Sequence, residues 1–215
     1  IIDGVDYKAP ISEKQMMGNI PYGTSVSAPD DVHAICASIA WDDYKGERTD
    51  IDFHLQSATR SFGWNSSYRS GDEVLFSGDM TSAGTETYRF NVTDEVFLAS
   101  VSLFSGEDGC PFKFFLSGAE NFRMKNSGMV DASKALTMPI NLEFAPSAHS
   151  MSIGFMKDKA FTFYGGSLGS DIVPKKDLYT KALDAIVDRV QSMLSLKDLI
   201  EFAGGTVVNA ITEKN

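Results

Sequence analysis

Two aspartates in the stretch Asp50-Ile51-Asp52-Phe53 have a spacing that suits metal binding. Alternate residues of a β-strand point to the same face with Cα atoms about 7 Å apart, so these two carboxylates can act together. They can bind one hard cation if a loop supplies further oxygens. The alternative is a solvated strand face that binds nothing. Candidate further donors lie nearby in the sequence: Asp42, Asp43, Glu47, Asp79 and Glu86.

Several short motifs follow this acidic strand. They are Gly63-Trp64-Asn65, then Val74-Leu75-Phe76-Ser77-Gly78-Asp79-Met80-Thr81, then Glu86 at the entry to another strand. In this order they resemble the TerD-type domain of tellurium-resistance proteins, over roughly residues 32–105. The resemblance implies a Ca²⁺-binding β-sandwich linked to bacterial stress or phage defence. It also implies the metal positions, which would be Asp50, Asp52, Asp79 and Glu86.

Enzymatic motifs are weak by comparison. The run from Gly165 to Gly169, Gly-Gly-Ser-Leu-Gly, fits the nucleophile-elbow pattern of hydrolases. In that fold the triad histidine follows the serine, but all three histidines precede Ser167: His33, His54 and His149. Zinc-ligand spacings and phosphate-binding glycine loops are absent from the sequence. We therefore predict that the protein is not an enzyme.

Four aromatic residues surround the acidic stretch: Trp41, Tyr44, Trp64 and Tyr68. Such residues can form a platform on which a carbohydrate stacks, or they can pack in the core and at its corners. Packing is the interpretation that we favour.

Composition limits the classes of partner. The 215 residues carry a net charge of −10, which argues against nucleic acid or an anionic membrane as the main partner. No apolar run is long enough for a transmembrane helix, and the first residues do not form a signal peptide, which favours a cytoplasmic location. Cys36 and Cys110 lie in apolar segments, so we expect two buried thiols, with one disulfide as the alternative.

Short strands separated by Gly and Asp turns dominate the first three quarters of the chain. In the stretch 50–56, Ile51, Phe53 and Leu55 are predicted to point inward, and Asp50, Asp52 and His54 outward. Strands are expected at 32–41, 50–56, 74–77, 85–92, 96–104, 112–116, 121–125, 140–144, 151–155 and 160–164. This pattern predicts a mainly β protein, a β-sandwich or jelly-roll-like domain with a C-terminal α-helical appendage.

The C-terminal part changes to helical periodicity. A helix is predicted over 175–194, and Ser195 with Asp198 resembles a capping box that opens a second helix, which Gly204-Gly205 ends. The apolar stripe of the first helix must pack on the sandwich, which we favour, or on a second copy of the chain. The stripe consists of Leu178, Ala182, Leu183, Ile186, Val187, Val190 and Leu194.

Three segments follow from these patterns: an extended N-terminal arm at 1–31, the β-sandwich at 32–165, and the helical segment at 166–215. The predicted function is a non-enzymatic binding or assembly module that resembles TerD-type calcium-binding proteins. The alternative is a structural protein, of the virion type or of another assembly, whose arm and C-terminal helix make subunit contacts. In either case the expected partner is a protein, either another copy of this chain or a different one.

Overall fold

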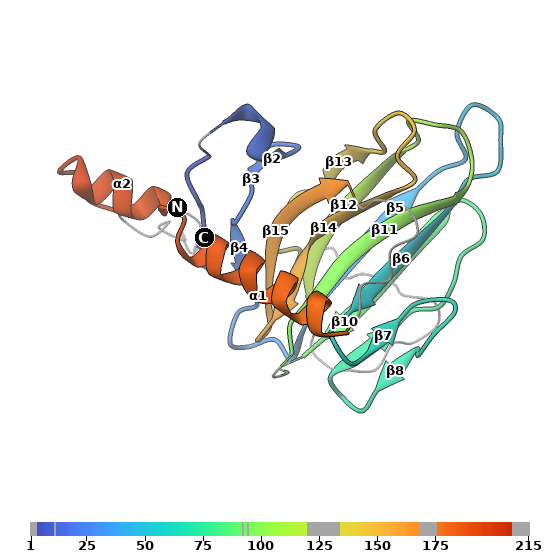
Figure 1. Cartoon of the computed structure of the whole chain (residues 1–215), viewed down its shortest axis with the longest axis horizontal. Helices are drawn as coiled ribbons and strands as arrows, with labels where there is room; N and C mark the ends of the chain where they lie inside the picture. The colour runs from blue at the N-terminus through green and yellow to red at the C-terminus, as the bar shows by residue number, and fades with distance from the viewer. Residues whose placement is uncertain are drawn as a thin grey trace, which may run out of the picture.

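Two antiparallel sheets stacked face to face form the body of the protein in the computed structural model (Figure 1). The structure describes residues 4–10, 12–91, 93, 95–119, 134–167 and 176–207. Strands dominate as far as residue 167, and two helices follow in the C-terminal part. This confirms the predicted fold class, a mainly β sandwich with a helical appendage.

The larger sheet has seven strands, in the order β1-β4-β15-β14-β11-β6-β7. Every neighbouring pair is antiparallel, and the three central strands are β15, β14 and β11, with β6 next to them. Its strands are β1 (Val5–Asp6), β4 (Ser25–Ser27), β6 (Asp50–Gln56), β7 (Ser61–Phe62), β11 (Phe97–Ser105), β14 (Ser150–Lys157) and β15 (Ala160–Ser167).

The smaller sheet has six strands, in the order β13-β12-β5-β10-β9-β8. Both faces of β5 are almost entirely buried, as its two apolar faces predict. The predicted strand at 121–125 lies outside the described residues. The strands of this sheet are β5 (Ala34–Trp41), β8 (Arg69–Ser70), β9 (Val74–Phe76), β10 (Gly84–Phe90), β12 (Pro111–Ala119) and β13 (Ile140–Glu143).

Aromatic rings from both sheets fill the space between them. The ring of Phe53 on β6 lies 4.9 Å from that of Tyr88 on β10 and 6.4 Å from that of Phe114 on β12, measured between centroids. Ile51 and Leu55, the inward neighbours of Phe53, are fully buried with it, so the predicted inward set is confirmed. Cys36 and Cys110 are buried free thiols, as expected.

The N-terminal stretch contains only very short elements, since its prolines and glycines interrupt every run. A turn of 3₁₀ helix (Glu13–Gln15) leads into a two-stranded hairpin of β2 (Met16–Met17) and β3 (Ile20–Pro21). The arm also supplies β1 and β4, which extend the seven-stranded sheet beyond β15. The segment predicted as an extended arm is therefore partly an edge of the sandwich.

Helix α1 (Lys176–Gln191) crosses the outer face of the seven-stranded sheet (Figure 1). At one end the Tyr179 hydroxyl donates a hydrogen bond to the backbone carbonyl of Gln56 on β6, at 3.0 Å. Further along, α1 and Tyr164 of β15 line one shallow pocket. Leu183 and Val190 are buried, so the sandwich covers part of the predicted stripe.

The remaining stripe residues are covered less or not at all. Ile186 and Val187 are half-buried, and Ala182 is exposed. Leu194 is exposed because α1 ends at Gln191, three residues earlier than predicted. The side chain of Leu178 lies outside the described part. Within the described residues, neither helix is long and apolar enough to span a membrane.

Helix α2 (Leu196–Phe202) extends away from the sandwich (Figure 1). The predicted capping box is present, because the Ser195 hydroxyl accepts the Asp198 N–H at 2.9 Å and the Asp198 carboxylate accepts the Ser195 N–H at 3.3 Å. The N-terminal arm holds the start of this helix, where the Leu196 N–H donates to the Tyr7 carbonyl at 2.7 Å. None of the α2 residues is buried.

Candidate metal centre

The site begins with an open strand edge. On one side β6 pairs with β11 along its length, but on the other side only Leu55 and Gln56 have a strand partner, in β7. The backbone of Phe53 therefore needs other partners at this edge. Its N–H donates to the Glu86 carboxylate at 2.8 Å, and its carbonyl accepts the Tyr88 hydroxyl at 2.9 Å. Two side chains of β10 thus close the edge across the sandwich.

The same glutamate fixes the loop before β10. One oxygen of Glu86 accepts the Phe53 N–H, and the other accepts the Met80 N–H at 2.9 Å. Gly78 has a φ of 110°, a conformation that side-chain-bearing residues rarely adopt, so the Ser-Gly-Asp sequence turns sharply here. The turn and the Met80 hydrogen bond together place Asp79 beside Glu86.

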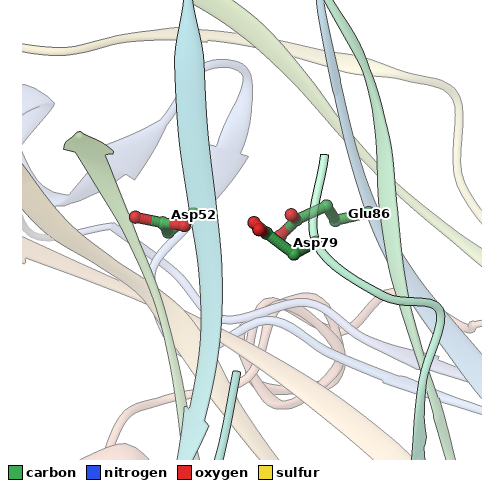
Figure 2. Close-up of side chains that lie close together, drawn as sticks. All are labelled: Asp52, Asp79 and Glu86. Carbon is green, nitrogen blue, oxygen red and sulfur yellow. The ribbon is translucent and has the colours of Figure 1, made fainter. Parts of the chain in front are cut away.

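Three carboxylates converge at this point. Oxygens of Asp52, Asp79 and Glu86 all lie within 4.8 Å of one another. Figure 2 shows Asp79, on the loop before β10, beside Glu86 of β10, with both carboxylates on the side that faces Asp52 of β6. Asp52 is only 5% exposed, and no hydrogen-bond donor among the described residues reaches its carboxylate. Asp79 is exposed and gives the cluster its access to solvent.

Burial and mutual repulsion disfavour the charged forms of these groups. Burial, together with the charges of Asp52 and Asp79, raises the pKa of Glu86 to about 8. The two backbone hydrogen bonds to its carboxylate act in the opposite direction and lower the pKa. Burial and the charges of Asp50 and Asp79 raise the pKa of Asp52 to about 7. Without a cation, the cluster therefore holds protons near neutral pH.

Asp50 does not join the three. Burial and the charge of Asp79 raise its pKa, while Arg48, 3.5 Å from its carboxylate, lowers it. The alternative of a solvated strand face is wrong, because Asp50 and Asp52, which were predicted to point outward, are both buried. Their side chains do alternate with the core residues, but other segments cover this face of β6.

The remaining candidate donors also lie outside the cluster. Asp43 uses one oxygen to accept the N–H groups of Thr49, at 3.1 Å, and Ala83, at 3.3 Å. It therefore connects the two loops that flank the site and is not part of the three-carboxylate group. Asp42 and Glu47, in the same turn, are likewise outside that group.

The sequence pattern did not reveal the role of Tyr88. Its hydroxyl donates a hydrogen bond to the Phe53 carbonyl, yet a tyrosine two residues before Phe90 on the same strand face looks like an ordinary core residue. The sequence contains one indication of this role. Tyr88 and Glu86 are two residues apart on β10, so their side chains point to the same face.

The hydrolase motif has no elbow geometry. Gly165 to Ser167 belong to β15, where Ser167 pairs with Met151 and Gly166 with Ser152 in an antiparallel ladder, next to a register shift after Ser152. A nucleophile elbow requires a sharp turn between strand and helix at the serine. The last two residues of the motif lie outside the described part.

Comparison with known proteins gives little guidance. No family model and no curated protein matches the chain. A solved structure titled "Crystal structure of unknown function protein SAV2460" is similar at 13% sequence identity and a TM-score of 0.41. The similarity covers 71% of this chain and 98% of the other.

Proposed function

We propose that the protein is a non-enzymatic binding module that holds a divalent cation, Ca²⁺, between Asp52, Asp79 and Glu86. The observation that carries this proposal is Asp52, a residue only 5% exposed, whose carboxylate accepts no hydrogen bond within the described chain and has an oxygen within 4.8 Å of oxygens of two other carboxylates. A buried charge without a partner is unstable unless it is neutralised. A cation supplies that neutralisation for all three groups.

The donor set fits calcium. Ca²⁺ prefers carboxylate oxygens at about 2.4 Å, so two oxygens on opposite sides of one ion are about 4.8 Å apart. The three side chains already lie within that distance of one another. When bound, the ion would balance negative charge and connect β6, the loop at Asp79, and β10. The chain's own contribution is to hold the carboxylates, with Glu86 fixed by its two backbone hydrogen bonds.

The biological setting that we propose follows the TerD resemblance, a calcium-dependent role in bacterial stress or phage defence. Three of the four positions that the resemblance implies as ligands, all except Asp50, are the three carboxylates that converge. The convergence of these three residues is the support for this biological setting. The cation test below does not depend on the setting.

Calorimetric melting with Ca²⁺ and with chelator tests the cation proposal. A ligand that binds only the folded state stabilises it by about 2.7 kcal/mol at a concentration one hundred times its dissociation constant. We expect Ca²⁺ to raise the melting temperature of the wild type and of the control Asp72→Asn, whose side chain is exposed in a turn. Asp52→Asn should lose the shift. An unchanged melting temperature in the wild type would refute the proposal.

We propose a second function, self-assembly through α2, because one observation favours it. Phe202 is 95% exposed, and Leu194, Leu196 and Leu199 are exposed on or next to the same helix. A pocket beside the start of α2 is lined by residues that include Pro10 and Met193. The occupant that we propose is Phe202 of a second copy, since an exposed apolar side chain and an apolar pocket on one molecule favour association of copies.

Native mass spectrometry tests the assembly. We expect the wild type and the control Lys197→Ser, changed on the same helix, to form dimers or larger species, and Phe202→Ser to be monomeric. Because no residue of α2 is buried in the described chain, Phe202→Ser should melt like the wild type. A monomeric wild type at high protein concentration would end the assembly proposal and leave the cation proposal unaffected.

A further inference from the structure

Exposed aromatic side chains gather around the acidic cluster. Trp64 is 44% exposed, Tyr68 43% and Phe104 66%. In the part of the chain that the structure describes, Phe202 on α2 is the other large aromatic side chain exposed to this degree. Trp41 is buried and Tyr44 is half-buried, so the packing role that the sequence favoured applies to these two. It does not apply to the exposed Trp64, Tyr68 and Phe104.

Trp64 and Phe104 come from opposite sides of β6 and meet near Asp52. Their ring centroids are 6.1 Å apart at an interplanar angle of 64°. Gly63, which precedes Trp64, lies so close to His54 that an added Cβ would be 2.8 Å from its Nδ1. On the neighbouring strand β11, Phe104 lies between residues that pair with Ile51 and Asp50. The ring pair therefore spans β6 between the levels of Asp50 and His54, the stretch that contains Asp52.

Tyr68 approaches the cluster from the side of β9. Its ring packs edge-on against Phe76, at 5.2 Å between centroids. The Phe76 ring in turn stacks on that of Tyr88 at 4.7 Å, and Tyr88 shares a face of β10 with Glu86. Desolvation and then the charges of Asp79 and Glu86 raise the pKa of the Tyr68 hydroxyl. Exposed rings thus border the three carboxylates on two sides.

A cation at this site would remain incompletely coordinated. Ca²⁺ takes about six to eight oxygen ligands, whereas the cluster supplies three carboxylates. Both oxygens of Glu86 already accept backbone N–H groups, which limits what that residue can add. Open coordination positions must be filled by oxygens from solvent or from a ligand, on the side where Asp79 is exposed.

Building on the cation site proposed above, we propose that this surface binds a neutral carbohydrate. Two vicinal hydroxyls would complete the coordination of the ion, and the apolar face of the sugar ring would pack on Trp64 and Phe104. Charge selects a neutral ligand, because the net charge of −10 and the buried Asp50 beside the cluster disfavour phosphates and carboxylates. The exposed rings favour a ligand with a flat apolar face over a simple diol.

Tryptophan fluorescence and calorimetric titration test this assignment. The probes are the methyl glycosides of mannose, glucose, galactose and fucose, each with millimolar Ca²⁺ and again with chelator. The chain has only two tryptophans, and Trp41 is buried, so a sugar on Trp64 gives a distinct emission change. We expect at least one glycoside to bind, its 2-deoxy analogue to bind more weakly, and chelator to abolish binding.

Variants separate this inference from the cation proposal. Trp64→Ala should weaken sugar binding by about tenfold or more, equivalent to about 1.4 kcal/mol, while the calcium-induced melting shift remains. The control Phe202→Ala removes an exposed aromatic ring on α2 and should bind sugar like the wild type. If calcium raises the melting temperature but no glycoside binds, the sugar inference fails and the cation proposal stands. Binding that survives chelator, or that Trp64→Ala leaves unchanged, also overturns the inference.

Discussion

Glu86 makes opposite contributions to stability at low and at high pH, and Glu86→Gln should separate them. Glutamine keeps the shape of the side chain but replaces one acceptor oxygen by a donor NH₂. In the wild type the two oxygens accept the Phe53 and Met80 N–H groups, so in the variant one N–H faces another donor. Leaving a buried donor unsatisfied costs about 1 to 3 kcal/mol.

The opposing effect is the removal of a buried charge. The pKa of Glu86 is raised from 4.5 to about 8, so the folded state holds this proton more tightly than the unfolded state does. The stability from this group is therefore complete below its unfolded pKa and is lost as pH rises through the folded one. Between pH 5 and pH 8 the loss amounts to about 3 to 4 kcal/mol, at about 1.36 kcal/mol per pKa unit. Glutamine does not ionise, so the Glu86→Gln variant does not lose stability in this way.

Urea unfolding in chelator at pH 5 and at pH 8 measures the balance. We expect Glu86→Gln to be less stable than the wild type at pH 5 and equally or more stable at pH 8. Asp52 titrates in both proteins, so their difference reports residue 86 together with its electrostatic coupling to Asp52. The control Glu143→Gln, on an exposed position of β13, should stay within about 0.5 kcal/mol of the wild type at both pH values. The reasoning is refuted if the difference between wild type and Glu86→Gln is the same at pH 5 and pH 8.

Three further predictions concern stability. Phe53→Ala removes a fully buried ring and should reduce the free energy of unfolding by about 3 to 5 kcal/mol, measured in urea. Gly154→Ala should prevent normal folding, because the added Cβ would lie 2.1 Å from the Thr162 carbonyl oxygen. The control Gly166→Ala, whose Cβ would come no closer than 3.6 Å to the Ser152 hydroxyl, should fold, as circular dichroism can check. Ser195→Ala should speed amide exchange in α2 by removing a cap worth about 1 kcal/mol, without changing the global urea midpoint, since α2 buries nothing.

The alternation of β6 could be predicted from sequence because it is local. Ile51, Phe53 and Leu55 recur every second residue, and a strand places such residues on one face. Whether the opposite face meets water is not local. It depends on Trp64 and Phe104, which reach that face from two other segments, and on the loop at Asp79. For this reason the sequence placed Asp52 on the right face but could not show that this position is buried.

The sequence predicted which residues form the acidic cluster better than it predicted how they are arranged. Asp52, Asp79 and Glu86 were all candidates, since carboxylates near turns and strand ends stand out in a sequence. The exclusion of Asp50 was not predictable, because two residues along a strand move a side chain by about 7 Å and a nearby Arg48 offers it another partner. The hydrogen bonds of Glu86 to Phe53 and Met80 use backbone groups, which carry no signal in the sequence.

The cation proposal and the open edge of β6 are linked through Glu86. An ionised Glu86 is the better acceptor for the Phe53 and Met80 N–H groups, so ionisation strengthens the closure of the edge. Ionisation also places a negative charge beside Asp52 and Asp79, which raises the free energy of the folded state when nothing neutralises it. A proton relieves the repulsion but weakens the acceptor, whereas a cation relieves it and leaves both hydrogen bonds intact. If the proposed ion binds, the contact between the two sheets should therefore be strongest in the ion-bound state, and cation binding would be coupled to the packing of the sandwich itself.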